Sequence, residues 1–318
     1  MGQLSARLRL RLGLMALFIV VPALAVIIYD QTVERGHARE RAVRETVRLA
    51  HVAAGQQAGV FDGVQRLLLT LSLFPGLLEP DPAACATLLP QVLHDHPAYI
   101  NVWVANADGS VFCSASESTP GMSNPNDSWL QRTIRARTTA VGDYEISPES
   151  GKAAVVLAHP LIGASEQVDR ILAVAIGLET FNVIASDAQI PQGATLTLAD
   201  RHHTILARYP DGEAWIGRPQ PEMPASRTSK AVASDSTMAT GADGIERVYT
   251  IVRVNTAMDS GLLVSMAIDR AAMFAEADEM LRRHLLLLGL VTLVALGVAL
   301  VGGQAFVLRP IETLRTVT

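Results

Sequence analysis

Two long apolar stretches lie near the ends of the chain and enclose a region of mixed pattern. The first, residues 12–29, carries no charge and would form a helix of about 27 Å, close to the roughly 30 Å hydrocarbon core of a bilayer. The second, residues 285–307, would span about 34 Å as a helix. We therefore predict two transmembrane helices, which frame the chain.

The charges before the first stretch predict its orientation. Residues 1–11 contain Arg7, Arg9 and Arg11, and basic residues on one flank of a span favour the cytoplasm. Residues 30–284 are then exported. A cleaved signal peptide is the alternative, because Ala23-Leu24-Ala25 has the pattern of a cleavage site. Both alternatives export the same region.

A helical pattern follows the first span. Residues 30–76 read as one long helix that ends at Pro75-Gly76, since this dipeptide stops helices. Spacings of four and three place a heptad seam along it. Its members are Val43, Val47, Ala50, Ala54, Gln57, Phe61, Val64, Leu68 and Leu71. The seam either pairs with its copy in a dimer or lies on its own domain.

The pattern then turns to short alternating strands, arranged in two similar sets. Residues 77–180 predict a short helix, a hairpin that turns at Asp108-Gly109, a helix from about Asp127 and three further strands. Residues 181–270 repeat this order in weaker form, with residues 221–244 expected to be loop with one irregular helix. We predict an α+β fold of two tandem modules, joined by a helix at residues 271–284 to the second span.

Composition excludes several classes of protein. At 49% hydrophobic and 18% charged residues the chain is not disordered, and its net charge of −5 provides no basic excess for binding nucleic acid. The chain has no motif of a nucleophile, a metalloprotease or a phosphate-binding loop. His94 with His96, and His202 with His203, lack the partners of a zinc site. We predict no enzyme activity, metal or cofactor within this chain.

The ordered elements resemble a known family. A membrane anchor, a long helix, the hairpin NADGSVFCSA and a second span are similar to the double Cache sensor regions, built of two PAS-like modules, of bacterial histidine kinases, diguanylate cyclases and chemoreceptors. Residues 308–318, with Pro310, are similar to the start of a HAMP linker. The resemblance implies a small-molecule sensor in the bacterial inner membrane that acts as a homodimer, with a kinase or cyclase output domain beyond residue 318. The alternative is a stand-alone membrane-anchored binding or interaction protein that signals through a separate partner.

The resemblance also implies where a ligand binds. In this family the membrane-distal module holds it, beneath a cover that corresponds to about Met122 to Arg137. The candidate ligand-binding residues are aromatic and polar side chains of that module: Tyr99, Trp103, Trp129, Arg132, Tyr144, Ser147 and His159. The signature of the amino-acid-binding subfamily is matched at Trp129 and Tyr144 but not at its other positions, so we do not expect an amino-acid ligand.

Two cysteines fall in the distal module. Cys85 lies on a predicted helix and Cys113 on a predicted strand. In an oxidising exported compartment these residues are a candidate disulfide, which would contribute about 3–4 kcal/mol in the chain-entropy model. The alternative is two buried thiols.

Overall fold

The computed structural model describes residues 2–79, 81–116, 124–163, 166–187, 190–220, 237–241, 243–258 and 260–303. The chain divides into two compact units. One is formed by residues 43–270, and the other by residues 1–42 together with 271–318.

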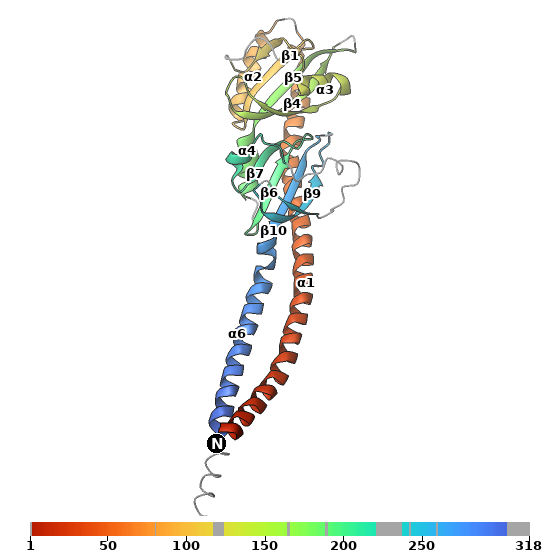
Figure 1. Ribbon diagram of the computed structural model, residues 1–318. Coiled ribbons are helices and arrows are strands. Elements are labelled where there is room, and N and C mark those ends of the chain that lie inside the picture. Colours follow the sequence, from red (N-terminus) through yellow and green to blue (C-terminus); the bar gives the residue numbers. More distant parts are fainter. Residues whose placement is uncertain are drawn as a thin grey trace, which may run out of the picture. The chain divides into compact units, whose positions relative to one another are not determined.

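The unit at the chain ends is made of two long helices, α1 (Gly2–Ser72) and α6 (Arg270–Gly303). Within this unit Arg35 of α1 pairs with Asp278 of α6 at 2.7 Å, so the two helices lie side by side (Figure 1). The predicted first span and the predicted long helix are parts of one continuous α1. The side chains of residues 1–17 lie outside the described ones, and so does the HAMP-like segment.

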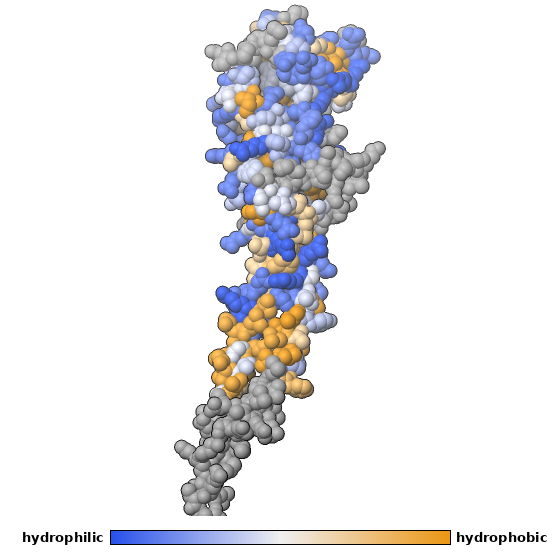
Figure 2. Space-filling model, in the orientation of Figure 1, coloured by the Kyte–Doolittle hydropathy of each residue, from blue (hydrophilic) through white to orange (hydrophobic). Residues whose placement is uncertain are grey.

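One described helix is long and apolar enough to cross a membrane. It covers residues 270–298 of α6 and has a mean hydropathy of 1.7. No residue of its most apolar stretch is buried. Leu286, Val291 and Leu293 are largely exposed there. Figure 2 shows hydrophobic surface gathered over this unit, in orange. The second predicted span, residues 285–307, therefore begins inside the candidate helix.

The first five-stranded sheet forms the distal module. Its strand order is β2-β1-β5-β4-β3, and all neighbours are antiparallel. The strands are β1 (Tyr99–Asn106), β2 (Val111–Ser114), β3 (Ala140–Ile146), β4 (Ala153–Ile162) and β5 (Val168–Gly177). A 3-10 turn, η1 (Pro75–Leu77), and two helices, α2 (Ala83–Asp95) and α3 (Ser128–Ala136), complete it.

The second sheet repeats this topology in the proximal module, with the order β7-β6-β10-β9-β8. The strands are β6 (Ala194–Ala199), β7 (Ile205–Tyr209), β8 (Thr237–Thr240), β9 (Glu246–Arg253) and β10 (Leu263–Asp269). The helices are α4 (Leu178–Asp187) and the one-turn α5 (Gly212–Trp215). The predicted α+β fold with a repeated hairpin and three-strand order is confirmed.

Two elements differ from the prediction. β8 is a strand inside the segment expected to be loop, because its backbone pairs with the free edge of β9 from Thr237 to Thr240. Residues 221–236 of that segment lie outside the described ones. The helix α4 was not predicted, and it covers the expected boundary between the modules. Phe181 of α4 stacks on Phe61 of α1 at 5.2 Å, so packing against α1 stabilises it.

The heptad seam of α1 lies in the core of its own domain. Its members from Ala50 to Leu71 are buried, and all of them except Gln57 join one apolar cluster with residues of both sheets. Val102, Val174 and Leu157 of the distal sheet belong to this cluster, as do Leu196 and Val264 of the proximal sheet. Of the two alternatives left open by the sequence, the seam therefore takes the second: it packs on the two modules of its own domain.

Candidate ligand-binding face of the distal module

Each distal strand directs alternate side chains to opposite faces of the sheet. One face packs on α1. The other, here called the α3 face, is covered by α3 and forms a second apolar cluster. Its central strands carry small residues: Ala154, Ala158, Ala173 and Ala175. The space that these alanines leave is occupied by two large rings, Trp103 of β1 and Trp129 of α3.

The two tryptophans meet edge to face, with ring centroids 5.6 Å apart. Trp129 is 1% exposed and Trp103 is 8% exposed. The indole Nε1 of Trp103 is buried and has no hydrogen-bond acceptor within the described part of the chain. A buried donor without an acceptor costs about 1–3 kcal/mol, and most such groups in native proteins have a partner. On the α3 face this indole N–H is therefore a donor that a bound molecule could satisfy.

Carboxylates lie on the same side of the sheet. Glu145 pairs across strands with Ala154, so its side chain is on the α3 face. Burial, followed by repulsion from Asp127 and Asp143, raises the pKa of Glu145 to about 7. Burial also raises the pKa of Asp127, which stands at the N-terminus of α3 without capping it. Among the described residues, the ionisable groups of this face that have no basic partner are thus acidic.

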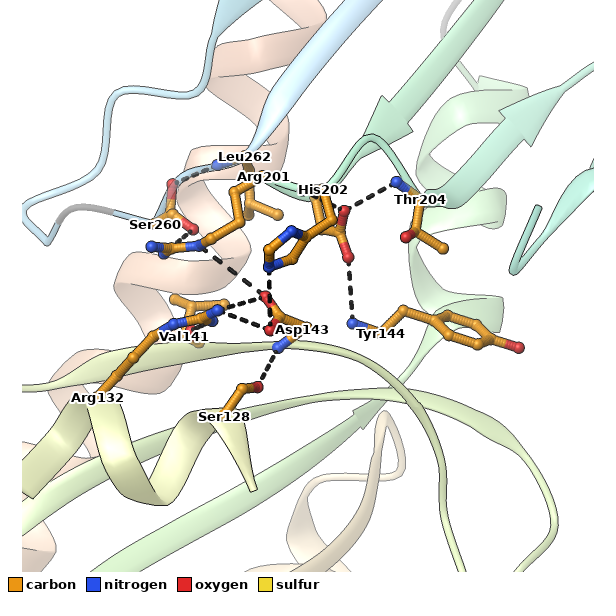
Figure 3. A network of polar contacts seen from close by, with 11 residues as sticks. Ser128, Arg132, Val141, Asp143, Tyr144, Arg201, His202, Thr204, Ser260 and Leu262 are labelled. Carbon is orange, nitrogen blue, oxygen red and sulfur yellow. Dashed lines mark hydrogen bonds and ion pairs between the residues drawn. The ribbon is translucent and has the colours of Figure 1, made fainter. Parts of the chain in front are cut away.

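The helix α3 is fastened to a bulge in β3. At Gly142 an added Cβ would lie 3.0 Å from Cβ of Trp129, tighter than most real Cβ contacts, so glycine favours this close approach. One turn of α3 then holds the bulge at two points. The hydroxyl of Ser128 accepts a hydrogen bond from the backbone N–H of Asp143 at 2.9 Å. Arg132 donates to both carboxylate oxygens of Asp143, at 2.7 and 2.6 Å, and to the carbonyl of Val141 at 2.8 Å (Figure 3).

The structure separates the seven sequence-predicted ligand residues. Trp103 and Trp129 are together on the α3 face, whereas the guanidinium of Arg132 is bound to Asp143. Tyr99 and Tyr144 pack against the α1 cluster instead. A β-bulge is the reason in each case. The bulge in β1 lies between Tyr99 and Asn101, and the bulge in β3 lies between Val141 and Tyr144. An extra residue at a bulge reverses the side to which the following or preceding side chain points.

The remaining two predicted residues also lie away from the tryptophans. His159 alternates with Ala158, so it points to the opposite face of β4, where its Nδ1 lies 2.8 Å from the hydroxyl of Thr139. Burial lowers the pKa of this imidazole. Ser147 is buried in the turn after β3, and its backbone N–H donates to the carbonyl of Lys152. A ligand role for Tyr99, Tyr144, Ser147 and His159 stays a prediction without support from this arrangement.

A polar junction joins the distal module to the proximal one (Figure 3). The carboxylate of Asp143 lies 3.9 Å from Nε of Arg201 and 3.4 Å from Nε2 of His202, both in the turn between β6 and β7. In return Asp200 of that turn accepts a hydrogen bond from the backbone N–H of Tyr144 at 3.3 Å. Asp200 also accepts from the N–H groups of His202 and Thr204 at 2.8 Å, so local hydrogen bonds stabilise the turn.

Sequence patterns did not mark Asp143, Glu145 or the side chains of the 200–204 turn as functional residues. The turn carried a signal, because Asp200 directly precedes Arg201-His202-His203 and an aspartate favours local hydrogen bonds to the backbone of a turn. Nothing in the sequence marked the bulge that brings Glu145 to the α3 face. Alternation alone would have placed Tyr144 there.

Comparison with solved structures adds the fold relationship. The extracellular domain of a putative histidine kinase, rpHK1S-Z16, superposes with a TM-score of 0.63 at 18% identity, over 74% of this chain and 97% of its own. The ligand-binding domain of the Pseudomonas fluorescens chemoreceptor CtaA, in complex with L-isoleucine, gives 0.61 at 17% identity, over 76% and 98%. The fold is double Cache-like.

A third neighbour has the same double Cache-like fold. The ligand-binding domain of the Pseudomonas aeruginosa amino acid chemoreceptor PctB, in complex with L-Arg, gives a TM-score of 0.60 at 16% identity, over 74% of this chain and 98% of its own. No family model and no curated protein matches the sequence. The structural likeness thus confirms the resemblance to double Cache sensor regions that the sequence suggested, at the level of the fold.

Proposed function

We propose that this chain is the extracytoplasmic sensor region of a signal-transduction protein of the bacterial inner membrane, and that it binds a small molecule on the α3 face. The observation that carries the proposal is the buried Nε1 of Trp103, which lacks an acceptor on the face where Trp129 and α3 cover small residues. A ligand acceptor at this atom would remove the cost of the unpaired donor. Apolar area with a few polar groups is typical of small-molecule sites.

The proposed ligand is not an amino acid. An α-carboxylate needs a cation, and Arg132 of α3 already holds Asp143 through two hydrogen bonds, while Arg135 of the same helix is exposed. In their ionised forms Asp127 and Glu145 would instead repel a carboxylate. CtaA and PctB are described with amino acids bound, and those ligands are not transferred to this chain. A neutral or cationic solute with an acceptor for Trp103 fits these residues better.

The bound state would reach the membrane through β10, because this strand ends at Asp269 and α6 begins at the next residue. In this proposal the region binds its ligand without transforming it. A homodimer is part of the proposal, since a shift of one helix needs a neighbour against which to act. The ligand must favour one of two states to produce a signal.

The test uses the full chain in lipid nanodiscs and a panel of metabolites that includes amines, polyols, nucleosides and organic acids. Thermal unfolding is followed for the natural chain, for Trp103→Phe, and for Trp215→Phe as the matched control. Trp215 lies in the proximal module, where its ring faces Arg208 at 4.4 Å. We expect at least one compound to stabilise the natural chain and the control, but to need roughly tenfold more to stabilise Trp103→Phe. The proposal fails if no compound stabilises the protein, or if all three respond alike.

A further inference from the structure

The contacts around Asp143 form a continuous path from the α3 face to the strand that leads into α6. The path begins on α3, one turn from Trp129, where Arg132 holds both oxygens of the Asp143 carboxylate. The two side chains are each 23% exposed, so solvent screens the pair only in part. Because Ser128 holds the backbone of the same residue, a movement of α3 carries Asp143 with it.

The path crosses to the proximal module at the same carboxylate. Arg201 approaches Asp143 at 3.9 Å and donates from its other end to the carbonyl of Ser260 at 3.2 Å. Gly261 follows Ser260 and has a φ of +66°. Its lack of a Cβ leaves room for the guanidinium, because an added Cβ would lie 2.8 Å from Nη2 of Arg201. Arg201 is therefore fitted against the segment that directly precedes β10.

We propose that Arg132, Asp143 and Arg201 form a relay that couples the position of α3 to the start of β10, and so to the strand that continues into α6. Asp143 is the shared acceptor, and Arg132 and Arg201 act as positioning residues on its two sides. His202 adds a second proximal partner at 3.4 Å. The role of the relay in signalling rests on the proposed function, but the mechanical coupling does not require a ligand.

This coupling predicts an effect at a distance. Arg132 makes its described contacts with Val141 and Asp143, and none with residues 258–264. If the relay operates, loss of Arg132 should nevertheless loosen the segment before β10 and the 200–204 turn. If Arg132 only fastens α3 to β3, the loosening should stop within the distal module. Local opening of this kind is measured by amide hydrogen exchange.

The experiment compares amide exchange of the full chain in nanodiscs for three forms: natural, Arg132→Met and Arg135→Met. Arg135 lies on the same helix and is exposed, so its variant controls for loss of charge on α3. We expect Arg132→Met to speed exchange about fivefold or more at Thr204 and at Leu262 to Val264. Exchange in the middle of β9 should stay unchanged. Acceleration confined to α3 and β3, or uniform across both modules, would overturn the relay.

A second variant guards against a folding defect in the first. Asp143→Asn keeps the shape of the side chain but removes its charge, and it should speed exchange at the same proximal amides. Unchanged proximal exchange in a folded Asp143→Asn protein would also overturn the proposal. Because neither measurement uses a ligand, failure of the relay and failure of the proposed function are separate outcomes.

Discussion

Arg132 of α3 donates to both carboxylate oxygens of Asp143 in β3, at 2.7 and 2.6 Å. The sequence analysis predicts this arginine as a ligand-binding residue. In the structure a carboxylate of the chain itself takes that place, and the same carboxylate faces Arg201 and His202 of the proximal module. The arginine thus contributes to the position of α3 and to the junction between modules.

Removal of this carboxylate charge should destabilise the domain. Asp143→Asn leaves Arg132 with a weaker acceptor in a partly buried place, so we expect a loss of about 1–3 kcal/mol in the free energy of unfolding. Glu179→Gln is the matched control, because Glu179 is 80% exposed and lies 3.4 Å from Lys152. That variant should stay within about 0.5 kcal/mol of the natural chain. Equal losses in the two variants, measured by chemical unfolding, would contradict this interpretation.

The buried carboxyl of Glu145 should make stability depend on pH. Its pKa is raised from 4.5 to about 7, first by burial and then by Asp127 and Asp143. The folded state therefore binds the proton more tightly than the unfolded state. Stability falls as the pH rises from about 4.5 to about 7, and the cost is fully present above pH 7.

Glu145→Gln cannot ionise, and it should escape this cost. Relative to the natural chain, the variant is expected to gain stability between pH 5 and pH 8, on the order of 2–3 kcal/mol at most. Thermal unfolding at the two pH values measures the difference, with Glu179→Gln as the exposed control. If the stability difference between the variant and the natural chain is the same at both pH values, Glu145 is not the titrating group.

Gly261 offers a test of the close approach to Arg201. Its φ of +66° disfavours any residue with a Cβ, and Gly151 has nearly the same φ, +68°, with nothing near its Cβ position. Both glycine-to-alanine variants should lose about 1–2 kcal/mol from the backbone alone. Gly261→Ala should lose more, because its Cβ meets the guanidinium. If the two losses are equal, Arg201 moves aside freely and is not fitted against this segment.

The disulfide between Cys85 and Cys113 joins α2 to β2, with Cα atoms 6.2 Å apart and a sequence separation of 28. Closing a loop of this size contributes about 3–4 kcal/mol in the chain-entropy model. We expect the double variant Cys85→Ser with Cys113→Ser to lose about that much stability. A reductant should lower the unfolding temperature of the natural chain but not that of the double variant. Two thiols that react with a maleimide in the oxidised, folded protein would argue against the bridge.

Much of the fold could be predicted because local signals agreed with it. The hairpin turn at Asp108-Gly109 is present, and Gly109 has the positive φ of +91° that such a turn requires. α1 ends at Ser72, just before Pro75. The repeated order of hairpin and three strands also followed from alternation. α4 escaped prediction because its formation depends on packing, with Phe181 against Phe61.

The candidate site was predictable only in part, since strand alternation decides which side chains share a face. Trp103 lies on a regular stretch of β1, so strand alternation correctly predicts the face of the sheet to which its side chain points. Tyr99 and Tyr144 lie next to bulges, which sequence patterns do not reveal, and both moved to the opposite face. The same bulge in β3 brought Glu145 to the α3 face. The α3 face therefore carries the carboxyl of Glu145 in place of the two predicted phenols.

The most direct test of the account is a hydrogen-exchange footprint of the full chain in nanodiscs with the first compound that stabilises it. The account predicts protection in β1 and in α3, around Trp103 and Trp129, with smaller changes at Leu262 to Val264. Protection confined to the proximal strands β6, β7 and β9, with none in β1 or α3, would place the ligand elsewhere and contradict the account.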